Sequence, residues 1–221
     1  MSYNLRENAA SGELTALATD HDIDILCLQE VDSTTLPERV EHMVLADATR
    51  NNRLGLAVYV RDERFEVKAT KLLALKKSLH DRVMAPAHER LLAVHLFDRV
   101  RDRDVLVGSF HAAPLTASNS LRRKQIAAAH DGMRALAPGL PALMVGDFNY
   151  PWFINGLERR LATEGFRLHR STEPTYLRYR FFSGYFDFVT STGYRVDRVD
   201  VLPAGASDHR AISFEAHLTT D

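Results

Sequence analysis

Several apolar segments of this chain end in acids, amides and histidines. One is PALMVGDFNYP, residues 141–151, where Gly146 breaks an apolar run and Asp147 and Asn149 follow at once. If the run is a strand, its two-residue alternation places both side chains on one side. The same change of residue type occurs elsewhere, at Asn4, Gln29, Glu30, His111, Asp208 and His209. Together these are the residue types of a metal-assisted hydrolytic site.

The oxygen-bearing members of this set suit a hard divalent cation. Mg²⁺ prefers one or two carboxylates, completed by water and by phosphate oxygens of the substrate. Glu30 and Asp208 can supply those carboxylates. Asp147 could orient and deprotonate an attacking water. Asn4 and Asn149 offer neutral amides, which can hold a phosphate oxygen without the repulsion of a further acid.

The histidines suit the negative charge that develops on a phosphate during hydrolysis. His111 and His209 could donate hydrogen bonds to phosphate oxygens. A histidine used in this way needs a carboxylate behind it. Asp187 in YFDFV is the candidate, although an edge-strand acid facing water explains it equally well. Zinc is disfavoured because no HExxH or CxxC spacing is present, and VGSFH lacks the GxSxG spacing of a serine nucleophile.

The composition indicates a globular protein with a sizeable core. The chain has 221 residues, of which 45% are hydrophobic and 26% charged, and its formal net charge is −1. No overall field would attract nucleic acid, so a polyanion would have to meet a local patch. The single cysteine, Cys27, lies in an apolar run and is interpreted as a buried hydrophobe. We see no signal peptide and no membrane-spanning run, so we expect a cytoplasmic protein.

Hydrophobic periodicity predicts the elements that position these residues. Helices are expected over residues 11–22, 35–47, 118–136 and 153–165. Strands are expected over 23–31, in four segments between 54 and 111, over 142–148 and in three segments after 184. No linker or repeat interrupts the chain, so residues 1–221 are interpreted as a single domain. Many strands and few helices favour an α/β fold in which two sheets pack face to face under outer helices.

The motifs resemble those of a known superfamily. In chain order, SYNLR, DILCLQEV, VLVGSFH, VGDFN, YFDFV and SDHRAI resemble the motif series of the endonuclease/exonuclease/phosphatase superfamily, from Asn4 to His209. The resemblance implies a four-layer α-β-β-α sandwich of two packed mixed sheets, with helices on the outer faces. It also implies hydrolysis of a phosphoester by in-line attack of water, with Mg²⁺ as the cofactor and Mn²⁺ as a substitute.

The resemblance also implies a role for each matching residue. Glu30 would be the main metal ligand, with Asn4 and Asp208 close to the ion.

In the catalytic group, Asp147 would activate water and Asn149 would bind the scissile phosphate. Asp187 would orient His209, and both His209 and His111 would contact phosphate oxygens.

Residues that bind the rest of the substrate are marked less clearly. Arg122 in LRRKQ is a candidate for a phosphate patch, and a solvent-facing helix flank explains it equally well. Arg90 would reach the substrate if its strand starts beside the site. Arg178 lies among tyrosines, a pattern typical of phosphate-and-base surfaces. Only three residues precede Asn4, so either the first strand is short or the natural start lies upstream.

Three functions are compatible with these observations. The first is a Mg²⁺-dependent phosphodiesterase, with nucleic acid among the candidate substrates. The second is a phosphomonoesterase, or a hydrolase of phospholipid or inositol phosphate headgroups, which the near-neutral charge favours. The third is a catalytically silent binding domain, which would need a broken position in the key set, and none is broken. Substrate identity and oligomeric state stay open.

Overall fold

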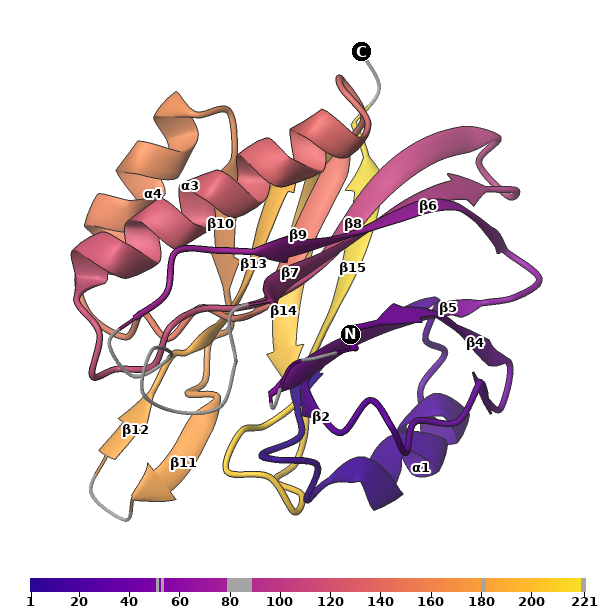
Figure 1. Cartoon of the computed structure of the whole chain (residues 1–221), viewed down its shortest axis with the longest axis horizontal. Helices are drawn as coiled ribbons and strands as arrows, with labels where there is room; N and C mark the ends of the chain where they lie inside the picture. The colour runs from indigo at the N-terminus through magenta and orange to yellow at the C-terminus, as the bar shows by residue number, and fades with distance from the viewer. Residues whose placement is uncertain (51, 53, 79–88, 180–181, 220–221) are drawn as a thin grey trace.

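The computed structural model describes residues 1–50, 52, 54–78, 89–179 and 182–219, in which two β-sheets pack face to face (Figure 1). The seven-stranded sheet has the order β14-β15-β1-β2-β5-β4-β3. Its strands are β1 (Ser2–Asn4), β2 (Ile25–Val31), β3 (Arg39–Val40), β4 (Met43–Ala48), β5 (Gly55–Arg61), β14 (Tyr194–Val201) and β15 (Ile212–Leu218).

The six-stranded sheet has the order β10-β13-β9-β8-β7-β6. Its strands are β6 (Phe65–Ala74), β7 (Glu89–Asp98), β8 (Arg103–His111), β9 (Ala142–Asp147), β10 (Arg167–Arg170) and β13 (Asp187–Thr192). A separate hairpin joins β11 (Tyr176–Tyr179) to β12 (Phe182–Gly184). Both large sheets are mixed, because β1 runs parallel to β2 and β8 runs parallel to β9.

The helices lie on the outer faces of the sheets. The short turn η1 (Ser11–Glu13) and helix α1 (Leu14–Asp20) cross from β1 to β2, and α3 (Asn119–Leu136) crosses from β8 to β9. Helix α4 (Ile154–Thr163) lies beside α3 on the same side of the molecule (Figure 1). Parallel neighbours need such crossovers.

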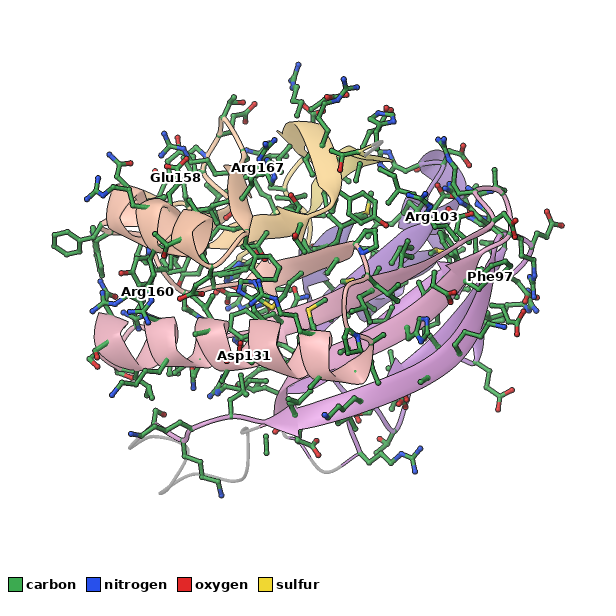
Figure 2. All side chains as sticks on the ribbon, turned by 90° about the horizontal axis from the view of Figure 1, so that it is seen from above. Phe97, Arg103, Asp131, Glu158, Arg160 and Arg167 are labelled. Atoms are coloured by element: carbon green, nitrogen blue, oxygen red, sulfur yellow. The ribbon has the colours of Figure 1, made fainter. Side chains whose placement is uncertain are left out.

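Three apolar clusters hold the layers together. The cluster between the sheets includes Cys27, Val58, Val94 and Val107, so Cys27 is a buried hydrophobe as predicted. A second cluster packs α3 and α4 on the six-stranded sheet, and a third packs α1 on the seven-stranded sheet. Charged side chains of the helices, among them Asp131, Glu158 and Arg160, project outward (Figure 2). The predicted four-layer sandwich is therefore confirmed.

Most of the predicted helices form, but one does not. Helix α3 begins after Ser118, whose hydroxyl accepts the Leu121 N–H at 3.2 Å. The helix predicted over 35–47 is wrong, because that segment forms β3 and β4. Val40, Met43 and Val44 have helical spacing, yet Val44 pairs with Val60 of β5 and thereby extends the sheet. Tertiary pairing overrides local pattern here. No helix in the described part of the chain has the length and apolar character needed to cross a membrane.

Partly buried ion pairs join the two sheets at the end opposite the predicted site. Asp98, at the end of β7, is 4% exposed and accepts hydrogen bonds from Arg64, the closest at 2.7 Å. Arg64 also donates to Asp24, which precedes β2, at 2.5 Å. Hydrogen bonding to Asp98 raises the pKa of Arg64. This end of the sandwich therefore depends on charge pairing for its alignment.

His130 of α3 is buried as a neutral histidine. Its Nε2 lies 2.9 Å from Oγ1 of Thr190, and its ring stacks on Phe166 with 3.7 Å between centroids. Burial lowers the pKa of His130 from 6.5 to about 3, and the charge of Arg134 acts in the same direction. Protonation of His130 therefore favours the unfolded chain.

We expect His130→Gln to make the protein less sensitive to acid. Because the pKa is lower in the folded state, the stability is present above pH 6.5 and is lost as the pH falls toward about 3. Between about pH 7 and pH 4.5, wild type should lose roughly 2–3 kcal/mol more unfolding free energy than the variant. Urea denaturation at both pH values measures this. His217→Gln, at a partly exposed position, is the control. An equal loss of unfolding free energy in wild type, His130→Gln and His217→Gln would contradict the prediction.

Candidate active site

The strand register brings the predicted residues to one edge of the sandwich. In the six-stranded sheet, His111 of β8 and Asp187 of β13 both pair with Asp147 of β9, one on each side. In the seven-stranded sheet, Asn4 of β1 pairs with Gln29 of β2, and Glu30 is the next residue. Residues directly opposite each other on neighbouring strands share a face. The three strands around Asp147 therefore present an aspartate–aspartate–histidine row toward Asn4 and Glu30.

The carboxylate of Asp147 lies at the centre of this group. Its Oδ2 accepts hydrogen bonds from Nδ2 of Asn4 at 3.2 Å and from Nδ2 of Asn149 at 3.1 Å. Nε2 of His111 lies 3.6 Å from the same oxygen, and Nε2 of His209 lies 3.7 Å from it. Four side-chain nitrogens from four separate segments thus face one oxygen. Asp147 itself is 2% exposed.

A left-handed backbone, and not strand alternation, aligns Asn149 with Asp147. Strand β9 ends at Asp147, and Asn149 has φ 48°. Its N–H then donates to Oδ1 of Asp147 at 2.8 Å. Other non-glycine residues with positive φ are Arg6, Glu7 and Asn8 in the turn after β1, Glu30 at an irregularity of β2, and Phe153 before α4. Such conformations cost about 1 kcal/mol or more each and tend to gather at functional sites.

The turn after β1 holds the carboxylate of Glu30. Oε2 of Glu30 accepts the N–H of Glu7 at 3.0 Å. Its Oε1 lies 3.4 Å from Nδ2 of Asn4 and 3.7 Å from Nε2 of His111. One carboxylate oxygen is therefore fixed by backbone, while the other faces the group around Asp147.

Asp187 and His209 form a buried ion pair. Nδ1 of His209 lies 2.9 Å from Oδ2 of Asp187, and both residues are at most 5% exposed. Burial alone would lower the pKa of His209, but the charges of Asp187 and Asp147 and the hydrogen bond to Asp187 outweigh it and raise the pKa to about 10. His209 is therefore a cation at neutral pH, with Nε2 directed toward Asp147.

Crowding of acids in a buried place also changes Asp147. Burial raises the pKa of Asp147, the charge of His209 lowers it, and Asp187 and Glu30 raise it again, with a result of about 7. Carboxylates in such an arrangement repel one another. A bound cation would relieve this repulsion, and the oxygen donors present suit a hard divalent ion.

Two groups of side chains differ in their ability to hold that ion. Ligand atoms of Asp147, Asp187 and His209 lie within 4.8 Å of one another. A protonated histidine cannot ligate a metal, so this group suits proton handling better. Glu30 and Asn4 adjoin each other. Oδ2 of Asp208 lies 3.8 Å from Nε of Arg6, and the hydroxyl of the preceding Ser207 donates to the Asn4 carbonyl at 2.7 Å. Glu30, with Asn4 beside it, is the better-suited part of the predicted metal set.

Buried hydrogen bonds pin the two sheets together directly behind the site. Nε2 of Gln29 donates to the hydroxyl of Ser109 on the opposite sheet at 2.9 Å, and that hydroxyl donates to the Leu28 carbonyl at 2.9 Å. Ser2 donates to Oε1 of Gln29 at 3.2 Å. Stacked sheets usually lie about 10 Å apart. Here the Ser109 hydroxyl reaches the backbone of the opposite sheet, so the two sheets are closer together and only small side chains fit between them. A Cβ on Gly146 would lie only 2.0 Å from the Phe110 carbonyl oxygen and 3.1 Å from Gln29.

The segment before β11 holds the Asp187–His209 pair in place. The hydroxyl of Thr175 accepts the N–H of Phe186 at 3.1 Å and that of Asp187 at 3.2 Å. The carbonyl of Thr175 accepts the Arg210 N–H at 2.7 Å. Sequence reasoning missed Thr175 and Ser109, and assigned Gln29 no role. The only signal for Ser109 was a polar residue inside the strand VLVGSFH, next to the predicted His111.

Two of the three arginines predicted to bind substrate are buried behind the catalytic group. Arg90 is 2% exposed and donates to the carbonyls of His111 and Ala112, at 3.1 and 2.9 Å. Arg122 is also 2% exposed and donates to the Pro114 carbonyl at 2.8 Å. Both support the turn after β8 from inside the protein. Arg178 belongs to β11, but its side chain lies outside the described part. Their substrate-binding role stays a prediction.

Comparison with known proteins identifies the family. The sequence model of the Endonuclease/Exonuclease/phosphatase family matches residues 1–209, and the chain therefore belongs to this family. Its members hydrolyse phosphoesters. No curated protein matches the chain.

Solved structures share the fold over nearly the whole chain. An endonuclease/exonuclease/phosphatase from Bacteroides vulgatus has a TM-score of 0.75 and 15% identity, covering 99% of this chain and 97% of that one. D. rerio TDP2, complexed with a single-strand DNA product, has a TM-score of 0.73 and 13% identity, with 98% and 97% covered. A Bacteroides thetaiotaomicron VPI-5482 mannosyl-6-phosphatase has a TM-score of 0.71 and 16% identity, with 98% of each chain covered.

Proposed function

We propose that the protein is a divalent-metal-dependent phosphodiesterase in which Asp147 activates the attacking water. The observation that carries the proposal is the buried Asp147 carboxylate, faced within 3.7 Å by nitrogens of Asn4, Asn149, His111 and His209. A base works best when its pKa lies near the working pH, and the pKa of Asp147 is raised to about 7. Family membership supports hydrolysis of a phosphoester.

Each side chain then has a defined task. Asp147 accepts a proton from the water while the oxygen of that water forms the new bond to phosphorus. The cationic His209, held by Asp187, donates a hydrogen bond to a phosphate oxygen that gains charge. Asn149 and His111 donate to further phosphate oxygens, so that the phosphoryl group stays in line with the water as the bond to the leaving oxygen breaks.

Glu30 is the proposed principal metal ligand, assisted by Asn4 and Asp208. Bound Mg²⁺ or Mn²⁺ would supply Lewis-acid stabilisation of the phosphate and of the leaving oxygen. The hydrogen bond from the Glu7 N–H to Oε2 of Glu30 leaves Oε1 on the side of the catalytic group. Hydrogen bonding to one oxygen of a ligating carboxylate orients the other.

Metal removal tests this proposal. We expect hydrolysis of bis(p-nitrophenyl) phosphate in Mg²⁺, a fall of roughly a hundredfold or more with excess EDTA, and recovery on adding Mg²⁺ or Mn²⁺. Release of p-nitrophenolate measures each rate, and unchanged thermal unfolding in EDTA would show that the loss is not caused by unfolding. Equal rates with and without EDTA would refute metal dependence.

A phosphomonoesterase is the second candidate. The observation in its favour is the combination of cationic His209 with His111 at the same carboxylate, since a monoester carries more negative charge than a diester. The structural likeness to a mannosyl-6-phosphatase is compatible with it. Comparing p-nitrophenyl phosphate with bis(p-nitrophenyl) phosphate separates the two, because a monoesterase would cleave the former far faster.

A further inference from the structure

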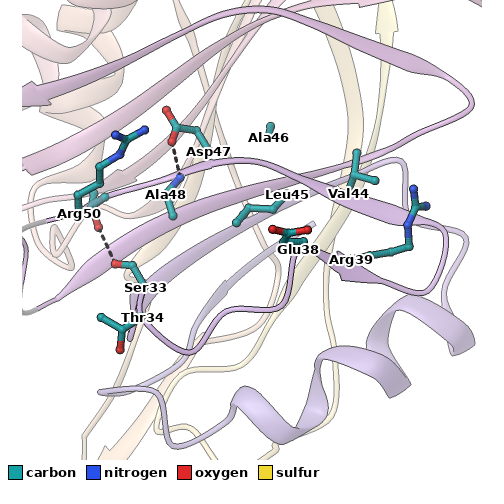
Figure 3. A pocket seen from close by; sticks show the side chains of 11 residues that line it. Ser33, Thr34, Glu38, Arg39, Val44, Leu45, Ala46, Asp47, Ala48 and Arg50 are labelled. Carbon is teal, nitrogen blue, oxygen red and sulfur yellow. Dashed lines mark hydrogen bonds between the residues drawn. The ribbon is translucent and has the colours of Figure 1, made fainter.

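A groove of about 750 Å³ runs along the free edge of β4 (Figure 3). It exists because β3 pairs with β4 only near Val44, after which the chain leading into β3 diverges from the strand. The last backbone hydrogen bond between β4 and this part of the chain runs from the Leu45 N–H to the Glu38 carbonyl at 2.9 Å. Pockets that bind small ligands have volumes of about 300–1,000 Å³. The groove is therefore large enough for a substantial part of a substrate.

One end of the groove adjoins the candidate active site. Ser33, in its wall, follows Glu30 by three residues, so their Cα atoms lie within about 11 Å. The hydroxyls of Ser33 and Thr49 lie 3.4 Å apart there. A Cβ on Gly55 would lie 2.6 Å from the Val31 carbonyl oxygen and 2.9 Å from each of these hydroxyls. This end is thus closely packed and fixed relative to β2.

The chemistry of the groove changes along its length. Ser33, Thr34 and Arg50 lie at the end near the site, while Arg39 marks the other end (Figure 3). Arg50 is exposed and forms no ion pair with the side chains that the structure describes.

Between these ends the groove is lined by β4, whose neighbouring side chains point to opposite faces: Val44 packs against the core between the sheets and Leu45 against the cluster around α1. Two acids line the groove: Asp47 already accepts hydrogen bonds from the Ala48 N–H at 2.8 Å and from Thr70 at 2.5 Å, and Glu38 is exposed. At the far end, Arg39 is bound to Asp62 at 2.7 Å. Among the described residues that line the groove, Arg50 is therefore the cation without an ion pair, and it lies next to the hydroxyls.

We propose that this groove binds the neighbouring nucleotide of a single-stranded nucleic-acid substrate. The inference rests on the proposed phosphodiesterase function. The guanidinium of Arg50 meets the next phosphate, and the hydroxyls of Ser33 and Thr34 meet the sugar. A phospholipid is a poorer match, because its acyl chains would need a continuous apolar wall and not one with charged side chains at both ends.

Matched variants test the inference with two kinds of substrate. Short single strands of DNA and RNA can occupy both the active site and the groove, whereas bis(p-nitrophenyl) phosphate is too short to reach the groove from the active site. Arg50→Ala should raise KM for the oligonucleotides about tenfold and lower the salt dependence of log KM by about 0.7. Arg103→Ala is the control, because that exposed arginine opens β8 about 26 Å from His111 and does not line the groove. All three proteins should hydrolyse the small diester equally.

A second pair of variants blocks the groove without altering charge. Thr34→Trp should also raise KM about tenfold for the oligonucleotides. Thr35→Trp should not, because Thr35 is the next exposed residue of the same loop and does not line the groove. Thermal unfolding of each variant checks its folding.

The outcomes separate this inference from the proposed function. If wild type cleaves the small diester but Arg50→Ala and Thr34→Trp leave oligonucleotide KM unchanged, the groove is not the subsite. If a short-chain phospholipid is cleaved instead and shows the Thr34→Trp effect, the substrate class is wrong. If wild type cleaves no phosphoester, the proposed function fails and this inference fails with it.

Discussion

Asp147→Asn is expected to lower kcat for bis(p-nitrophenyl) phosphate about a thousandfold. Asparagine keeps the shape of the side chain and can still accept the Asn149 N–H, which lies 2.8 Å from Oδ1. It cannot accept a proton from water. We also expect the variant to unfold at a higher temperature, because the wild-type carboxylate is buried and its pKa is raised by burial. Initial rates at saturating Mg²⁺ and thermal unfolding measure the two effects.

Asp98→Asn is the matched control for this prediction. Asp98 is also a buried acid of the six-stranded sheet, but it lies at the opposite end and binds Arg64 at 2.7 Å. Its replacement should leave kcat unchanged and lower the unfolding temperature, the reverse of the pattern at Asp147. If Asp147→Asn were as active as wild type, another residue would have to be the base.

Asp187→Asn and His209→Gln are each expected to lower kcat by about 10²- to 10⁴-fold, and the double variant should be no worse than the poorer single variant. In the proposed mechanism the two side chains act as one unit, because Asp187 raises the pKa of His209 and holds its ring with Nε2 on the side of Asp147. KM should change less than kcat, since the cation matters most when charge develops on the phosphate. Steady-state kinetics of the three variants measure this.

The chain contains a second histidine–carboxylate pair that serves as control. Nε2 of His95 lies 2.8 Å from Oδ1 of Asp104 on the six-stranded sheet, far from the site and partly exposed. Asp104→Asn breaks the same kind of contact and should leave kcat unchanged. If the fall in log kcat of the Asp187→Asn, His209→Gln double variant equalled the sum of the two single falls, the two residues would act independently, contrary to the prediction.

The residue types of the site could be predicted from sequence because each sits where an apolar run stops. Glu30, Asp147 and Asp187 are acids at the ends of buried strands, a position that core packing does not require. Their order along the chain identified the superfamily and with it the sandwich. The helix over 35–47 was predicted wrongly because the spacing of Val40, Met43 and Val44 is compatible with two structures. Pairing of Val44 with Val60, sixteen positions away, decided between them.

Only the tertiary structure decided how these residues meet. Asn4 and Asp147 are 143 positions apart, and Gln29 and Ser109 are 80 positions apart, so no local pattern specifies either contact. The left-handed turn at Asn149 and the burial of Arg90 and Arg122 were equally invisible, because each depends on neighbours from other strands. Residue chemistry is a property of the chain, and it determined which groups were available. Distances and pKa values arise from packing between distant segments, so the fold determined what those groups could do together.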